Sequence, residues 1–149
     1  MKNKNTIKKI TVIPLDKIKN INGDVLKIME KDSNGFEGFG EAYFSNANWG
    51  STKAWKMHTR MTMNLIVPVG AVKFVFAEKN QDGTTEYLIE EIGADNYNRI
   101  IVPPGIWFGF EGMTKSQNLV LNIANIKHKP AEIQRLPIEA FDFNWGINK

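Results

Sequence analysis

Lys53-Ala54-Trp55-Lys56-Met57-His58 is the stretch that decides the fold. Side chains two apart on a strand share a face, so Lys56 and His58 are expected on one face, with Trp55 and Met57 on the other. A second apolar strand, Asn64-Leu65-Ile66-Val67, follows at once and stops at Pro68-Val69-Gly70. The pattern predicts a strand pair that presents a histidine and a lysine together. In an all-β domain that face either lines a pocket or meets solvent.

Short apolar segments separated by turn residues continue along the chain. Asn80-Gln81-Asp82-Gly83 predicts a hairpin turn, and the one helical pattern is a turn or two around Ala131-Glu132-Ile133, within residues 130–141. Further strands are expected at 7–13, 25–29, 41–45, 72–77, 87–92, 99–102, 106–110 and 119–125. Many short strands at fairly regular spacing favour a sandwich or small barrel over βαβ units.

Length and composition indicate one globular domain spanning residues 1–149, of which 42% are hydrophobic and 23% charged. No apolar run approaches the roughly 20 residues of a membrane span, so no membrane partner is predicted. Residues 1–6 form a basic arm that is expected to be mobile, and no apolar segment behind it makes a signal peptide. The chain has no cysteine, which excludes disulfides and thiolate chemistry and makes a reducing cytoplasm the simplest location.

The net charge of +3 comes with lysines clustered near the N-terminus. A nucleic-acid site would need aromatic stacking residues beside such a patch, and the first aromatic residue, Phe36, lies well downstream. Nucleic acid is therefore not the predicted partner. The lysines are interpreted as a solvated edge that discourages aggregation, or as an attraction for an anionic ligand such as a nucleotide diphosphate.

Four segments together resemble a known family. They are Gly23-Asp24, the strand pair 53–70, the segment 101–110 with Pro103-Pro104-Gly105, and the close at 130–141. In this order and spacing they are similar to the RmlC-like double-stranded β-helix (cupin) domains that act on nucleotide-linked 4-keto sugars. Two branches are relevant, the dTDP-4-dehydrorhamnose 3,5-epimerases and the dTDP-4-keto-6-deoxyhexose 3,4-ketoisomerases. The resemblance implies a jelly-roll-like cupin barrel, with the short helical tail after it.

The match at the family's catalytic positions is partial. The ketoisomerases carry an Arg-Gly-x-His-x-His strand, onto which Lys53, Lys56 and His58 fall as the arginine and the two histidines. In the epimerases the catalytic histidine corresponds to Lys56, and the catalytic lysine falls near Asn64. Their tyrosine falls near Leu121, and Phe108 replaces the histidine that follows the Pro-Pro-Gly turn.

The family's chemistry explains a histidine at this place. A ketone at C4 acidifies the protons on C3 and C5, and histidine is a suitable base near neutral pH. A donor or cation must stabilise the enediolate. We therefore expect His58 as the base, with Lys56 and Asn64 stabilising the enediolate. A second acid returns the proton, and the sequence does not choose among Tyr43, Tyr87 and Tyr97.

No metal or other cofactor is expected. Metal-dependent cupins use three histidines and a carboxylate, and the corresponding positions here hold Lys56, His58, Met61 or Thr62, and Phe108. One ligand of four does not hold a metal.

Substrate-binding candidates follow from the same alignment. Lys53 and Arg60 could meet a diphosphate or simply face solvent. Trp107 and Phe108 could stack on a base or sugar, or pack in the core. Asn122 sits on a strand, where asparagine is disfavoured, so it either lines a polar pocket or ends the strand.

Two large apolar side chains, Trp55 and Met57, should face outward if His58 faces the barrel interior. Such a patch suggests a subunit interface, and the family resemblance implies dimers, so a homodimer is predicted.

The function that these residues favour is metal-independent epimerisation or isomerisation of a nucleotide-linked 4-keto-6-deoxy sugar, in the synthesis of a surface polysaccharide such as O-antigen or capsule. The alternative is a non-catalytic cupin that binds a sugar nucleotide or partners a sugar-modifying enzyme. A small barrel that binds nucleic acid through its lysine-rich arm is a third, weaker interpretation.

Overall fold

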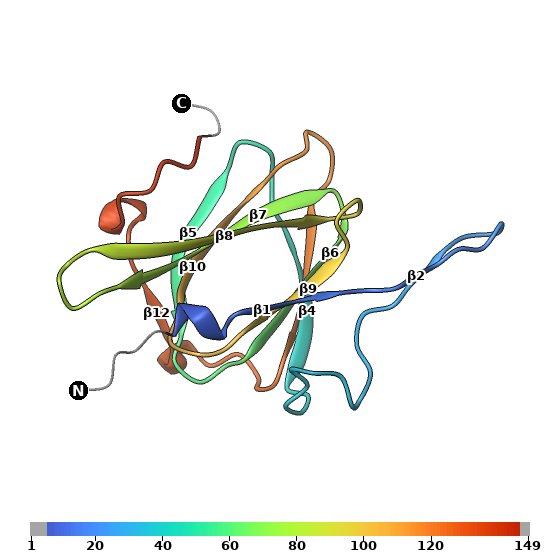
Figure 1. Ribbon diagram of the computed structural model, residues 1–149, viewed down its shortest axis with the longest axis horizontal. Coiled ribbons are helices and arrows are strands. Elements are labelled where there is room, and N and C mark those ends of the chain that lie inside the picture. The colour runs from blue at the N-terminus through green and yellow to red at the C-terminus, as the bar shows by residue number, and fades with distance from the viewer. Residues whose placement is uncertain (1–5, 147–149) are drawn as a thin grey trace.

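Two five-stranded antiparallel sheets face each other in the computed structural model, which describes residues 6–146 (Figure 1). The first sheet has the order β1 (Thr11–Pro14), β9 (Asn98–Val102), β6 (Met63–Val69), β11 (Leu119–Ala124), β4 (Glu41–Asn46). The second has the order β12 (Ile133–Arg135), β5 (Thr52–His58), β10 (Trp107–Gly112), β7 (Ala71–Lys79), β8 (Thr85–Gly93). A short ribbon of β2 (Lys17–Ile18) and β3 (Val25–Leu26) projects from the body. The predicted all-β jelly-roll architecture is confirmed. No helix within residues 6–146 is long and apolar enough to cross a membrane.

The main core lies between the two sheets. Alternate residues of β6 and β7, among them Met63, Leu65, Phe74 and Phe76, point inward and are at most 3% exposed. Because strand side chains alternate with period two, the intervening residues of β6 reach the outer face of the first sheet. There Ile66 packs with Tyr97 and Leu121 in a separate cluster. This alternation decides which predicted site residues can reach the barrel interior.

The N-terminal segment departs from the predicted strand at residues 7–13. Residues Ile7–Lys9 form a 3-10 turn, η1, and only Thr11–Pro14 pair with β9. The backbone N–H groups of Thr6 and Ile7 donate to the Glu78 carboxylate at 2.9 Å each, so the chain is anchored by a side chain instead of a strand partner. The predicted strand at 25–29 shortens to β3, because only Val25 and Leu26 pair with β2. Residues 1–5 of the predicted mobile arm lie outside the described residues.

The tail at 130–141 contains two 3-10 turns and a strand where one or two helical turns were expected. The turns are η2 (Pro130–Glu132) and η3 (Ile138–Ala140), and β12 lies between them. Ile133 pairs with His58, and Arg135 pairs with Lys56, along the edge of β5. Pairing with this open edge outweighs the weak helical pattern, and Pro137 cannot lie inside a helix without breaking it.

A register shift in β5 changes which lysines share a face. On the neighbouring strand β10, Phe108 pairs with Lys56 whereas Phe110 pairs with Lys53. Gly109, the one residue between them on β10, therefore opposes two residues of β5, Ala54 and Trp55, which is the geometry of a bulge. Strict alternation predicts Lys53 and Lys56 on opposite faces, but the bulge brings both beside the same cavity.

The outer face of the second sheet corrects the predicted subunit interface. Trp55 does point away from the barrel interior, but it is only 1% exposed because the chain's own C-terminal segment covers it. Its ring centroid lies 5.0 Å from that of Phe141 and 5.3 Å from that of Trp145, and its Nε1 donates to the Ile138 carbonyl at 3.0 Å. Trp55 is thus core, and it supplies no exposed patch for a partner subunit.

Candidate active site

A cavity of about 390 Å³ opens between the two sheets. Its apolar walls come from inward-facing residues of β6, β7 and β10, including Leu65, Phe74 and Phe110. Its polar lining consists of Tyr43, Ser45, Thr52, Lys53, Lys56, Asn122 and Arg135. The three charged side chains that line the cavity are all basic. Such a cavity favours an anionic ligand that also has an apolar or ring-shaped part.

Lys56 and Arg135 are adjacent in this cavity because β12 pairs with β5. Burial lowers the pKa of Lys56, the neighbouring Arg135 charge lowers it further, and the carboxylates of Glu132 and Glu41 oppose the shift. Arg135 was not among the predicted site residues, because the sequence placed residues 130–141 in a helical tail. Two neighbouring cations in a partly buried cavity can stabilise negative charge that develops on a bound ligand.

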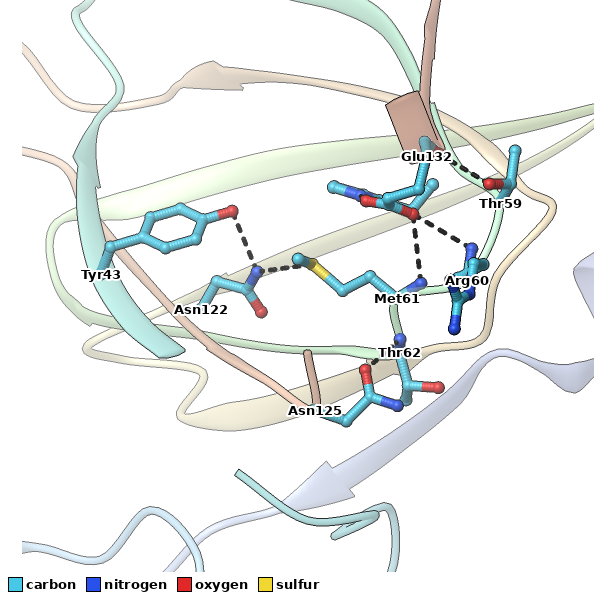
Figure 2. A network of polar contacts seen from close by, with 9 residues as sticks. Tyr43, Thr59, Arg60, Met61, Thr62, Asn122, Asn125 and Glu132 are labelled. Carbon is cyan, nitrogen blue, oxygen red and sulfur yellow. Dashed lines mark hydrogen bonds and ion pairs between the residues drawn. The ribbon is translucent and has the colours of Figure 1, made fainter. Parts of the chain in front are cut away.

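His58 forms a buried pair with Glu132 at the end of β5. The imidazole Nδ1 faces Glu132 Oε1, while Oε2 accepts backbone N–H bonds from Arg60 at 3.1 Å and Met61 at 3.3 Å (Figure 2). Burial lowers the pKa of His58, outweighing the raising effect of its hydrogen bond to Glu132. Burial by itself would raise the pKa of Glu132, but the hydrogen bonds from His58 and the two amides lower it overall.

The resulting pair is a neutral imidazole held by an ionised carboxylate. Because Nδ1 donates its proton to Glu132, Nε2 is the nitrogen left to accept one. Nε2 is buried, and it has no hydrogen-bond partner among residues 6–146. A neutral histidine with one fixed tautomer and one open nitrogen can act as a general base.

Phe108 stands beside this histidine in the cavity wall. Its ring is nearly parallel to the His58 ring, with an interplanar angle of 15° and centroids 6.2 Å apart. Phe108 lines the cavity and His58 does not, so the imidazole lies in the layer next to the cavity wall. Phe108 therefore serves the packing of His58 as well as the cavity surface.

Tyr43 and Asn122 form a second polar pair in the cavity lining, from the paired strands β4 and β11. Asn122 Nδ2 donates to the Tyr43 hydroxyl oxygen at 3.0 Å, which leaves the phenolic proton free to be donated elsewhere. Burial raises the pKa of Tyr43, despite the opposing effect of the hydrogen bond from Asn122, so the phenol stays protonated at neutral pH. Figure 2 shows Met61 between Asn122 and Glu132; its sulfur lies 3.8 Å from Asn122 Nδ2.

The structure thereby distinguishes the three tyrosines that the sequence left open. Tyr87 donates from its hydroxyl to the Asp142 carbonyl at 3.0 Å, outside the cavity. Tyr97 is buried in the cluster on the outer face of the first sheet. Only Tyr43 among them lines the cavity.

Three predicted site residues lie elsewhere. Asn64 points to the outer face of β6, where its side chain donates to the Gly35 carbonyl at 3.0 Å and accepts from Arg99. Arg60 is exposed in the turn after β5 and does not line the cavity. Trp107 projects to the opposite face of β10 from Phe108, beside Trp55 and Phe141. The structure brings together Lys53, Lys56, Phe108 and Asn122, with His58 next to them.

Glu132, like Arg135, is a functional candidate that the sequence did not indicate. It lies 74 residues from His58 in the chain, in a segment whose sequence pattern predicts a helical turn. A lone glutamate after Lys129-Pro130 carries no signal of a histidine partner. Only the pairing of β12 with β5 brings it to His58.

No group of three or more metal-ligating side chains occurs within residues 6–146. The two members of the histidine pair, His58 and Glu132, are engaged with each other. Independence from metals stays a prediction based on the residues at the cupin ligand positions.

No protein-family model matches the chain. The crystal structure of a dTDP sugar isomerase from Desulfovibrio desulfuricans G20 is similar with a TM-score of 0.86 and 32% identity, over 93% of this chain and 92% of that one. A dTDP-4-dehydrorhamnose 3,5-epimerase from Bacillus anthracis str. Ames, with TDP and PPi bound, is similar with a TM-score of 0.78 and 15% identity, over 94% of this chain and 86% of that one. The spore coat polysaccharide biosynthesis protein SpsL of Bacillus subtilis (strain 168) is 24% identical over 130 residues, 83% of this chain and 86% of that protein.

Proposed function

The chain belongs to the RmlC-like cupin family of dTDP-sugar isomerases and epimerases, and from this premise we propose that it converts a nucleotide-linked 4-keto-6-deoxy sugar by metal-independent epimerisation or isomerisation. The observation that carries the proposal is the buried His58–Glu132 pair beside a cavity lined by Lys56 and Tyr43. The similarity of the chain to SpsL supports a place in the biosynthesis of a surface polysaccharide, such as O-antigen or capsule. The cytoplasmic location stays a prediction.

His58 Nε2 is the proposed base. It takes a proton from C3 or C5 of the sugar, and Glu132 stabilises the imidazolium that forms. Because the His58 ring lies behind Phe108, the proposal requires the Phe108 ring to turn when the sugar enters. The C–H electron pair moves into the carbonyl, giving an enediolate with its negative charge at O4.

Lys56 is proposed to stabilise that charge. Its ammonium lines the cavity on the same strand as His58, and its partial burial strengthens its interaction with an oxyanion. Asn64, the other predicted stabiliser, has no place in this step, because its side chain is on the outer face of β6.

Tyr43 is proposed as the acid that returns a proton. It lies on β4 in the sheet opposite His58, and its raised pKa keeps the phenol protonated. Protonation of the same carbon from the opposite face gives epimerisation. After abstraction at C3, protonation at C4 gives isomerisation, with the O3 hydroxyl proton moving to O4 as the ketone forms at C3. The tyrosinate then regains its proton from water and the imidazolium loses one, so the protein is unchanged.

The nucleotide is proposed to lie beside the basic side chains of the cavity lining. Lys53 and Arg135 supply charge for the diphosphate, while Phe108 and Phe110 offer aromatic surface for the base or sugar. Asn122 would hold Tyr43 in place, so it acts through the tyrosine as well as lining the cavity.

Proton NMR in heavy water with dTDP-, UDP- and GDP-linked 4-keto-6-deoxy sugars tests this function. Deuterium is expected at C3, at C5 or at both in at least one of these sugars, because enolisation exchanges the abstracted proton with solvent. Saturable binding of one nucleotide sugar with no exchange at either carbon would instead support the alternative, a non-catalytic sugar-nucleotide-binding cupin or partner subunit.

Arg135→Gln is expected to weaken dTDP binding about tenfold, the lower end of the about 1.5–3 kcal/mol that a charge-assisted hydrogen bond to phosphate contributes, because this side chain is exposed. Titration calorimetry at low and high salt measures it, and the difference should shrink as salt screens the pair. Arg60→Gln is the matched control, since Arg60 lies outside the cavity lining. Weaker binding by Arg60→Gln with no change for Arg135→Gln would contradict this placement of the diphosphate.

A homodimer stays a prediction, but its interface cannot be centred on Trp55. Exposed apolar side chains lie elsewhere, with Phe39 at 67% and Phe44 at 62% exposed and Ile21 at the tip of the β2–β3 ribbon fully exposed. We propose that exposed apolar side chains of residues 39–44 and the β2–β3 ribbon, which projects from the body in Figure 1, take part in the subunit contact.

A further inference from the structure

Arg99 is a buried cation that the proposed reaction does not use. It is 2% exposed and lies on β9, where it pairs with Ile66 of β6. Ile66 faces the outer side of the first sheet, whereas Leu65 lines the active-site cavity. Arg99 is therefore on the opposite face of this sheet from the proposed active site.

The hydrogen bonds of Arg99 leave one buried N–H of its guanidinium without an acceptor in the described part of the chain. Nη1 donates to the Asn34 carbonyl at 2.8 Å and to Asn64 Oδ1. Nε is buried and has no acceptor within residues 6–146. A guanidinium has five N–H donors, so pinning the loop at Asn34 accounts for only one of its three nitrogens.

The charge of Arg99 is also uncompensated. No carboxylate in the described part of the chain lies within ion-pair distance of it. Burial lowers its pKa, but an arginine side chain keeps its proton in proteins. Burying an unpaired charge is costly, and the neutral acceptors at Asn34 and Asn64 offset only part of that cost.

A cavity of about 160 Å³ lies against this side chain. Arg99 and Ser33 contribute to its lining together with the apolar side chains of Ile13 and Leu15. Lys27 and Glu30 also line it and form an ion pair with each other at 3.0 Å, which leaves Asp16 as its unpaired acid. Since a water molecule takes up about 30 Å³ of liquid, the space holds a small tetrahedral or planar anion and some water.

We propose that Arg99 anchors a second, separate site that binds a small oxyanion, a phosphate or carboxylate group, on the outer face of the first sheet. The oxyanion would accept hydrogen bonds from the Arg99 guanidinium where it lines the cavity, and would neutralise the buried charge. Guanidinium groups bind both anions through paired, charge-assisted hydrogen bonds. This inference does not depend on the proposed reaction, since none of its residues lines the active-site cavity.

Calorimetric titration with inorganic phosphate tests the site in a Lys53→Gln/Arg135→Gln background, which removes two cations from the active-site cavity. Saturable binding of one phosphate per chain is expected, and Arg99→Met should weaken it at least tenfold. Asp16→Asn should strengthen phosphate binding severalfold, because the substitution removes from the cavity lining an exposed negative charge that repels the phosphate. Equal phosphate affinity with and without Arg99→Met would overturn the proposal.

Crystals soaked in selenate give a readout that does not require the Arg99 variant to fold. Anomalous density within hydrogen-bond distance of the Arg99 guanidinium is expected in this cavity, and selenate bound only elsewhere would overturn the site. Competition titrations with acetate and with dTDP then separate the sources of the oxyanion. Displacement by acetate indicates a carboxylate ligand, and displacement by dTDP indicates the phosphoryl group of a nucleotide.

Discussion

His58→Asn is expected to slow deuterium exchange at C3 or C5 of the sugar by a factor of about 10²–10⁴, the usual contribution of a positioned general base. Asparagine has no nitrogen that can accept a proton at neutral pH, but it can still donate to Glu132 and fill part of the space. Single-turnover NMR measures the exchange, and dTDP binding should change little because His58 does not line the cavity. His128→Asn is the matched control, since His128, the second of the two histidines, is exposed.

The pH dependence of kcat/KM identifies which residue is the base. Burial lowers the pKa of His58 below its ordinary 6.5, so a rate that needs neutral His58 stays high at neutral pH and falls only as the pH drops through that lowered value. The pKa of Lys56 is lowered from 10.5, and a lysine base would make the rate rise with pH above neutrality. An acidic limb below pH 6.5 that disappears in His58→Asn is expected.

Lys56→Met completes this test. It should reduce the rate, because it removes the charge that stabilises the enediolate. The acidic limb of the pH profile should remain, because that limb reports the protonation of His58. A rate that survives in His58→Asn but is abolished in Lys56→Met, with a limb well above pH 7, would assign the base to Lys56 instead.

Trp55→Ala is expected to lower the free energy of unfolding by about 3–5 kcal/mol, the range for truncating a large buried aromatic side chain. The loss follows from the packing of Trp55 against Phe141, Phe143 and Trp145 and from its hydrogen bond to the Ile138 carbonyl. Chemical denaturation measures the change. Trp49→Ala is the control, since Trp49 is 41% exposed and its truncation should cost far less.

Sedimentation velocity separates this explanation from an intersubunit role. If Trp55 is core, the native Trp55→Ala protein keeps the oligomeric state of the wild type and is simply less stable. Dissociation of an oligomer with unchanged stability would return Trp55 to the subunit interface and contradict the packing described above.

Most of the strands could be predicted because their signals are local. Turn residues such as Asn80-Gln81-Asp82-Gly83 and the alternation in β7 act over a few residues, and the observed strand β8 (Thr85–Gly93) begins two residues earlier than predicted. The prediction failed where a segment took a partner distant in the sequence. Thr6 and Ile7 donate backbone hydrogen bonds to Glu78, and residues 133–135 pair with the edge of β5.

The candidate site likewise has residues whose placement follows from local sequence and residues whose placement does not. Spacing in one strand places Lys56 and His58 on a common face, because alternation is a property of the strand backbone itself. Asn64 could be assigned to the pocket from its alignment position, but alternation from Met63 and Leu65 puts it on the other face of β6. Lys53 reaches the cavity only because of a bulge, which depends on the pairing of β5 with β10.

By itself, then, the sequence determined an all-β chain, its family, and a strand that carries a lysine and a histidine. Turn residues and the alternation of side chains along a strand depend only on neighbouring residues, so both can be recognised in the sequence. The tertiary structure decided that Glu132 holds His58, that Tyr43 is the tyrosine in the cavity, and that the chain covers its own Trp55. Each of these depends on which distant segments pack together. His58 and Glu132 are 74 positions apart in the sequence, and Trp55 and Trp145 are 90 apart. Contacts over such separations leave no periodic or compositional signal in β5, the strand that carries His58 and Trp55.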